Sequence, residues 1–235
     1  MSSFLPFPQP QYKAVFMARP QRFLADMVLA DGTRTLAYCA NPGSLAGCLQ
    51  TGSPALLWDS RDPKRKRRYT LRAVELNGFW IGTDTNFSNL LAEEVLSQGL
   101  VPGLAHYETL ERERRVEEGL RVDFVLTGPG GNCFVEVKSA TVVEEGVARF
   151  PDSVTPRSVK QLRWLARKAA AGERAVLLYV VQRGDAEVFT INGKHSRAYA
   201  EAFKEAYASG VEVFAVAAGV RAKGFERPKL LPFRY

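Results

Sequence analysis

Apolar and polar residues alternate over short distances in the first third of the chain, as they do in half-buried β-strands. Glycine, proline, asparagine and aspartate interrupt this alternation, which indicates tight turns between the strands. The runs with strand character are 12–17, 22–29, 35–39, 53–59, 69–76 and 79–83. So many short strands in so few residues favour a small OB-like β-barrel over a sandwich, and we expect it to occupy residues 1–83.

After residue 83 the pattern changes to helical periodicity alternating with more apolar strands. Helices are predicted at 86–99, 155–172 and 196–210, and strands at 174–182, 187–191 and 211–220. The strand at 174–182 is nearly all apolar, which is typical of a strand buried on both faces of a sheet. We therefore predict a second domain, 84–235, with a mixed sheet flanked by helices, and a two-domain chain of the α+β or α/β class.

Within the second domain, a β-hairpin is predicted between the helices at 86–99 and 155–172, with a glycine-rich turn at 128–131. Successive side chains of a strand point to opposite faces, so Glu136 and Lys138 share a face while Val135 and Val137 point into the core. On the preceding strand, Asp123 lies between two apolar residues and faces away from them. The hairpin should therefore bring two carboxylates and one lysine together.

This arrangement has two interpretations. Two close carboxylates repel each other, and a hard divalent cation such as Mg²⁺ or Mn²⁺ relieves that repulsion. A neighbouring lysine can orient an attacking water and stabilise charge on a phosphate, so Asp123, Glu136 and Lys138 fit a metal-dependent nuclease. The alternative is a cross-strand ion pair on a solvated face, which would have no catalytic or binding role.

The charge balance favours polyanionic partners, with 32 Lys+Arg against 25 Asp+Glu, a net charge of +7 and a pI of about 9.4. A basic loop next to Tyr69 suits backbone phosphates and a stacked base, or is simply a solvated charge run. A further basic face is predicted on the second helix, where it could follow phosphates or keep the helix soluble. The candidate phosphate-binding residues are Lys64, Arg65, Lys66, Arg67 and Arg68 in the loop and Arg157 and Lys160 on the helix.

Other residue counts limit the chemistry. The three cysteines have no metal-ligand spacing and do not suggest a disulfide framework, and the two histidines lack a carboxylate or cysteine neighbour at ligand spacing. The first residues lack the pattern of a signal peptide, and no apolar run is long enough to cross a membrane. We therefore expect a cytoplasmic protein with no membrane partner.

Six runs of residues, taken together and in order, carry a family resemblance. They are RFLADMVLADG (22–32), NPGSLAGC (41–48), RVDFVL (121–126), FVEVKSAT (134–141), FPDSVTPR (150–157) and GVEVFA (210–215). With them the chain resembles the sugar fermentation stimulation protein A family along almost its whole length. The resemblance implies an N-terminal OB-fold domain that binds nucleic acid, a C-terminal domain of the PD-(D/E)xK nuclease superfamily, and DNA binding as the associated activity.

The resemblance also implies roles for individual residues. It puts Asp123 and Glu136 on the metal, Lys138 at the attacking water, and Glu94 at the acidic position that often completes such a site. Arg121 precedes the metal-binding aspartate as in the family, and either meets a phosphate or braces the hairpin. The chain departs from the family at Gln161, where a histidine is common, and in the barrel at 38–43, where the family usually has a histidine before an Asn-Thr-Gly turn.

Two functions remain open at this stage. The first is a Mg²⁺- or Mn²⁺-dependent nuclease that hydrolyses phosphodiester bonds in DNA, with RNA as a further candidate substrate. The alternative is a non-catalytic DNA-binding regulator of sugar or maltose metabolism that uses a nuclease fold as a scaffold. The sequence does not determine the oligomeric state, and a homodimer is one alternative.

Overall fold

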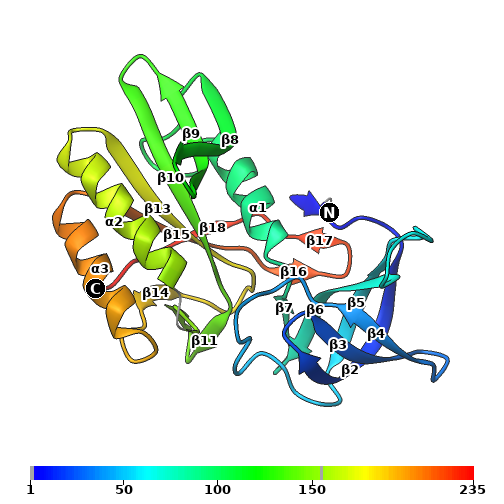
Figure 1. The fold of residues 1–235 in the computed structure, drawn as a ribbon. Coiled ribbons are helices and arrows are strands. Elements are labelled where there is room, and N and C mark those ends of the chain that lie inside the picture. The colour runs from blue at the N-terminus through cyan, green and yellow to red at the C-terminus, as the bar shows by residue number, and fades with distance from the viewer. Residues whose placement is uncertain (1–2, 154–155) are drawn as a thin grey trace.

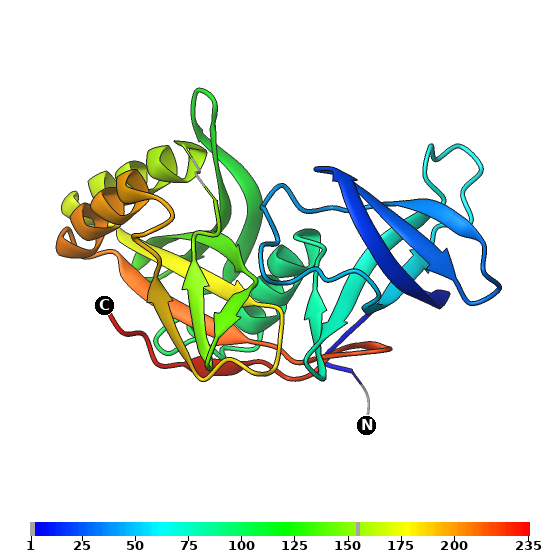
Figure 2. The ribbon, with the colours of Figure 1, turned by 90° about the horizontal axis from the view of Figure 1, so that it is seen from below.

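The computed structural model describes residues 3–153 and 156–235 and has two domains, which Figure 2 shows side by side. The N-terminal domain is a β-barrel in which the sheet order is β4-β3-β2-β5-β6-β7, and a pairing of β4 with β6 closes it. Its strands are β2 (Gln11–Gln21), β3 (Leu24–Leu29), β4 (Arg34–Tyr38), β5 (Pro54–Asp59), β6 (Tyr69–Leu76) and β7 (Phe79–Gly82). Met27, Leu57 and Leu71 are fully buried inside it. The predicted OB-like barrel is confirmed.

The C-terminal domain is built on a six-stranded mixed sheet in the order β18-β15-β13-β10-β9-β8. Strands β10, β13 and β15 run parallel, and the other neighbours are antiparallel. The bounds are β8 (Thr109–Glu117), β9 (Leu120–Gly128), β10 (Gly131–Ala140), β13 (Arg174–Val181), β15 (Glu212–Ala217) and β18 (Lys229–Leu231). This agrees with the predicted mixed sheet flanked by helices.

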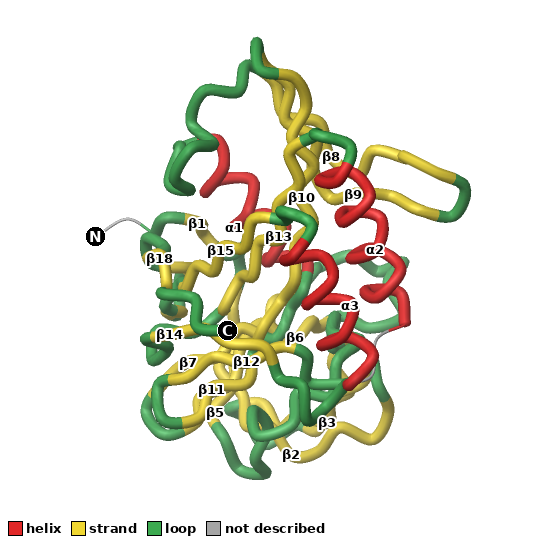
Figure 3. The backbone as a smooth tube through the Cα atoms, turned by 90° about the vertical axis from the view of Figure 1, so that its left-hand side faces the viewer, coloured by secondary structure: helices red, strands yellow, loops and turns green. Residues whose placement is uncertain are grey.

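Helices cover both faces of this sheet, as Figures 1 and 3 show. Helix α1 (Asn86–Ser97) packs on one face, and helices α2 (Pro156–Ala170) and α3 (Arg197–Ala208) pack together on the other. Strand β13 reveals the two layers, because Val176 and Leu178 join the cluster of α1 while Leu177 and Tyr179 join the cluster of α2 and α3. Side chains on either face of the central strands are therefore buried. Of the predicted second helix, residue 155 lies outside the described residues.

Several strands were not predicted from the sequence. Strand β8 carries mostly exposed charged residues, so it lacks the apolar alternation that identifies a strand. The unpredicted strands β11 (Val142–Glu144) and β12 (Val147–Phe150) form a small sheet with β14 (Val188–Ile191), which agrees with the strand predicted at 187–191. Another joins β1 (Leu5–Pro6), β17 (Gly224–Phe225) and β16 (Val220–Arg221), so the start of the described chain packs against the C-terminal domain.

Buried polar contacts join the two domains where β7 leads into α1. The side-chain amide of Gln182, at the end of β13, donates to the carbonyl of Asp84 at 3.0 Å and to Ser88 Oγ at 2.8 Å. Asp84 also forms a buried ion pair with Arg72 of β6. Gly82 leaves room for Gln182, since a β-carbon at Gly82 would lie 2.4 Å from Gln182 Oε1. None of the helices in the described part of the chain has the length and apolar character needed to cross a membrane.

Candidate active site

The hairpin of β9 and β10 positions the two predicted carboxylates. Regular pairing of these strands ends at Phe124 and Val135, and the strands separate beyond that point. Beyond it, the Asp123 side chain replaces the backbone partner of β10, because its Oδ2 accepts a hydrogen bond from the backbone N–H of Val137 at 2.8 Å. Its Oδ1 accepts from Asn89 Nδ2 of α1 at 3.3 Å. Asp123 is thus fixed at the gap between the strands, next to Glu136.

Glu136 and Lys138 share one face of β10, beneath α2, as their spacing predicts. They are 2% and 7% exposed, because α2 packs over this face of β10. The alternative of an ion pair on a solvated face is therefore wrong. Lys138 Nζ donates to Glu136 Oε1 at 2.5 Å and to Gln161 Oε1 of α2 at 2.9 Å. Gln161, where the family often has histidine, therefore orients the lysine.

The environment of Glu136 makes its negative charge costly. The pKa of Glu136 is raised from 4.5 to about 7, chiefly by burial and in part by the nearby charge of Asp123, while Lys138 lowers it. The single positive charge of Lys138 does not neutralise the negative charges of both Asp123 and Glu136 in a site with little water. A hard cation bound by both oxygens would remove this cost.

The donor set fits Mg²⁺ or Mn²⁺ but is small. Among residues 3–153 and 156–235, no group of three or more histidine, cysteine, aspartate or glutamate side chains is placed to hold a metal ion. Mg²⁺ commonly binds through one or two carboxylates and completes its shell with water and substrate phosphate oxygens, so Asp123 and Glu136 are sufficient ligands for it.

Glu94 is held elsewhere on its helix. It accepts a hydrogen bond from Gln98 at 3.1 Å, and the preceding Glu93 pairs with Arg112 of β8 at 3.0 Å. The contact from α1 to the carboxylate pair comes from Asn89 instead. Asn89 was missed because an asparagine within a helix gives no distinct sequence signal. The role predicted for Glu94 stays a prediction.

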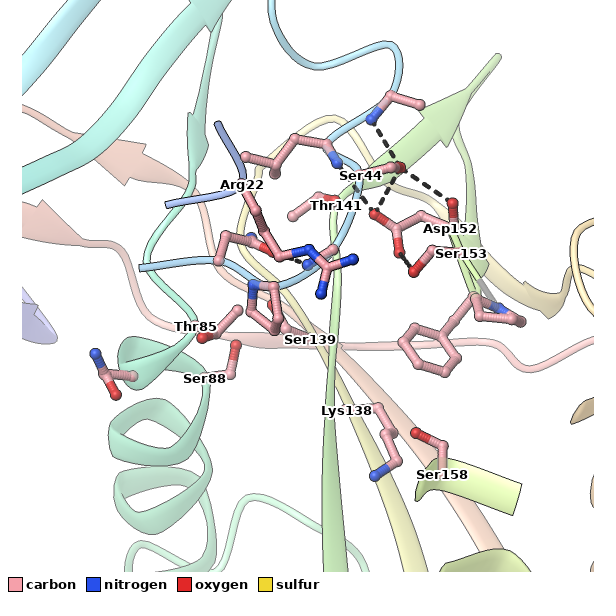
Figure 4. Close-up of a pocket in the computed structure, with 18 of the residues that line it drawn as sticks. Arg22, Ser44, Thr85, Ser88, Lys138, Ser139, Thr141, Asp152, Ser153 and Ser158 are labelled. Carbon is pink, nitrogen blue, oxygen red and sulfur yellow. Dashed lines mark hydrogen bonds between the residues drawn. The ribbon is translucent and has the colours of Figure 1, made fainter. Parts of the chain in front are cut away.

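Lys138 and Asn89 line a cleft of about 1210 Å³ between the barrel and the sheet domain, and Asp123 and Glu136 lie next to them without lining it. Figure 4 shows residues of the barrel, such as Arg22 and Ser44, and residues of the sheet domain, such as Lys138 and Ser158, around the same space. Arg157 at the start of α2 also lines it. The amino ends of α1 and α2 both lie at this cleft, so their partial positive charges add to those of the basic side chains.

Asp152 attaches the sheet domain to the barrel at one side of the cleft. Its Oδ2 accepts hydrogen bonds from Ser44 Oγ and from the backbone N–H of Leu45, both at 3.2 Å, as Figure 4 shows for Ser44. A β-carbon at Gly43 would lie 2.8 Å from Asp152 Oδ2, so glycine is needed for this close approach. Asp152 therefore connects two domains that the sequence pattern had separated.

The basic loop that follows β5 projects from the barrel on the side away from the sheet domain (Figures 1 and 2). Arg68 pairs with Asp59 at 2.7 Å, and Arg65 lies over the ring of Trp58 at 5.2 Å. Lys64 and Lys66 are exposed. The expectation that Tyr69 stacks on a base is not supported, since it is 9% exposed.

The remaining predicted phosphate-binding residues lie on the sheet domain. Arg121 is exposed on β9, with Glu113 at 3.8 Å. Lys160 is exposed on α2 and does not line the cleft, whereas Arg157, one turn earlier, does. Of the candidate basic residues, Arg157 is thus the one that lines the cleft, and Arg22, which had not been predicted, lines it from the barrel.

Comparisons with known proteins agree with this architecture. Residues 17–83 match the family model described as SfsA N-terminal OB domain, and residues 86–224 match the sugar fermentation stimulation protein RE domain. A sugar fermentation stimulation protein homolog of Geobacter sulfurreducens is 41% identical over 225 residues, covering 96% of this chain and 97% of the relative. One from Ruegeria pomeroyi is 42% identical over 221 residues, covering 93% and 96%.

The solved structures include a similar protein. The structure of Pyrococcus furiosus SfsA in complex with Ca²⁺ aligns over 100% of both chains, with a TM-score of 0.88 and 25% sequence identity. Both domains, their order and nearly the full length of the relatives are therefore matched. The chain belongs to the sugar fermentation stimulation protein family.

Proposed function

We propose that this protein is a metal-dependent nuclease that hydrolyses phosphodiester bonds of DNA, and of RNA where it is offered. The observation that carries the proposal is the group formed by the half-buried Asp123 and the buried Glu136 and Lys138, of which Lys138 lines the interdomain cleft. A protein that only binds DNA gains nothing from two adjacent carboxylates, one of them buried, near a phosphate backbone, because they repel it and burial costs desolvation energy. The same carboxylates are useful if they hold a cation.

Asp123 and Glu136 would hold Mg²⁺ or Mn²⁺, and the Ca²⁺ in the Pyrococcus furiosus relative is consistent with a site for a hard cation. Such a cation would supply Lewis-acid polarisation of the scissile phosphate. Lys138 points its ammonium group at Glu136 and Gln161, where it can stabilise negative charge on a phosphate oxygen or orient water. Asn89 and Gln161 keep Asp123 and Lys138 in place.

Basic groups around the cleft would hold the substrate backbone. Arg22 and Arg157 line it from opposite domains, and the net charge of +7 would attract a polyanion over longer distances. The three cysteines are free and buried, which supports a role in the reducing cytoplasm.

The test is cleavage of labelled single-stranded DNA, duplex DNA and RNA with Mg²⁺, Mn²⁺ or EDTA. Wild-type protein should cut at least one of them with metal and none with EDTA, and Glu136→Gln should cut none. Lys204→Ala is the matched control, since it removes an exposed basic residue of α3 that does not line the cleft and should retain cleavage. Glu94→Gln decides whether that carboxylate takes part. Binding without cleavage under every condition would refute the nuclease and favour the DNA-binding regulator.

A further inference from the structure

Two exposed aromatic side chains lie beside the cleft on the barrel. Phe23 and Tyr38 are 43% and 36% exposed, and their rings stack with centroids 6.2 Å apart and planes 25° apart. Phe23 directly follows Arg22, which lines the cleft, and its carbonyl accepts from the backbone N–H of Cys39 at 3.0 Å. Exposing two large rings costs solvation free energy, which binding of a flat ligand would recover.

The same pair also adjoins the basic loop. Tyr38 is in register with Thr70 of β6, where the barrel closes, and Thr70 Oγ1 accepts a hydrogen bond from Arg65 at 3.1 Å. The outer surface of the second and third barrel strands, here β3 and β4, is the side that OB folds use for oligonucleotides. Backbone pairing and the Arg65 contact thus connect the basic loop to Tyr38, and Phe23 connects Tyr38 to Arg22 at the cleft.

The form of this surface selects one strand type. Bases in a duplex are already stacked on each other, so only an unpaired base can present its face to Phe23 or Tyr38. The cleft volume of about 1210 Å³ is slightly more than the roughly 300–1,000 Å³ of pockets that hold one drug-sized ligand. It has room for a few nucleotides of one strand. Glu136 and Lys138 are also recessed, at 2% and 7% exposure.

We infer that the protein binds single-stranded nucleic acid, with unpaired bases stacked on Phe23 and Tyr38 and the strand entering the cleft past Arg22. This inference deepens the proposed nuclease function. It rests on that function for one point, which is that the bound strand leads toward Lys138. It assigns the substrate class and two base-stacking residues. The basic loop then holds phosphates of the same strand outside the cleft.

The experiment measures fluorescence anisotropy of a labelled oligothymidine of about twenty residues, longer than the roughly 4–16 nucleotides one OB fold covers, and of a duplex of equal length, both in EDTA. Wild-type protein should bind the single strand more tightly than the duplex. Phe23→Ala and Tyr38→Ala should each raise the Kd for the single strand by about fivefold or more, because one base stack is lost. Phe79→Ala, which removes a ring 45% exposed on β7, is the matched control and should leave the Kd unchanged.

Two further measurements separate stacking from other roles. Phe23→Leu keeps an apolar side chain and should still weaken binding, and the slope of log Kd against log salt should stay as in wild type because no phosphate contact is lost. Arg22→Ala should instead reduce that slope by about 0.7. Equal Kd values for wild type, Phe23→Ala and Tyr38→Ala would overturn the inference. So would duplex binding as tight as single-strand binding, or a change of oligomeric state in these variants without a change in Kd.

The outcomes also distinguish this inference from the proposed function, because binding is measured without metal. Tight single-strand binding that depends on Phe23 and Tyr38 supports the inference even if no strand is cut with Mg²⁺ or Mn²⁺, in which case only the nuclease proposal fails. Metal-dependent cleavage with full binding by Phe23→Ala and Tyr38→Ala supports the nuclease and overturns the inference.

Discussion

Replacing Glu136 by glutamine should change how the stability of the metal-free protein depends on pH. The folded-state pKa of Glu136 is raised from 4.5 to about 7, chiefly by burial. Between these values the folded protein keeps a proton that the unfolded chain releases, so the free energy of unfolding falls as pH rises. The favourable contribution is fully present below pH 4.5 and is lost above about pH 7. A glutamine cannot ionise, so this part of the pH dependence disappears in Glu136→Gln.

The magnitude follows from the shift in pKa. A change from 4.5 to about 7, at about 1.36 kcal/mol per pKa unit, corresponds to about 3 kcal/mol. For a chain of 235 residues that is roughly 6–12 °C in Tm, at about 2–4 °C per kcal/mol. The difference in Tm between Glu136→Gln and wild type should therefore increase by this amount from pH 4.5 to pH 8.

The assay is thermal unfolding in EDTA at a series of pH values, with wild type and Glu136→Gln side by side. Lys138 stays buried in both proteins, so the change with pH is compared and not the absolute Tm. Parallel curves for the two proteins would refute the assignment of a costly buried charge to Glu136. Mg²⁺ at pH 8 should raise the Tm of wild type more than that of Glu136→Gln, because a cation that binds only the folded state stabilises it.

Three other substitutions test separate parts of the structure. Lys138→Met should abolish cleavage and leave oligonucleotide binding within a few-fold of wild type; retained cleavage would contradict its role. Asp84→Asn should lower the free energy of unfolding by about 3–5 kcal/mol in denaturant titrations, because it leaves Arg72 buried without its counter-charge. Gly43→Ala should displace Asp152 and weaken the contact between domains, which faster proteolysis of loop 41–49 would report; an unchanged cleavage pattern would contradict it.

Local patterns were sufficient for the elements with strong periodicity. The barrel strands, the three helices and the hairpin follow from alternation, apolar stripes and glycine-rich turns, because these express which face of each element is buried. Strand β8 was missed for the same reason, since its side chains are mostly exposed and charged and are held in the sheet by backbone pairing with β9. A sequence pattern cannot reveal a strand that buries almost nothing.

The sequence by itself determined that Asp123, Glu136 and Lys138 would meet, because a hairpin fixes the register and face of its residues. Only the tertiary structure decided that Glu136 and Lys138 are buried, since α2, distant in sequence, covers them and supplies Gln161. It also decided the contact of Asn89 with Asp123 and the cleft between the domains. Such contacts depend on how helices and domains pack, and the spacing of residues along the chain does not predict that packing.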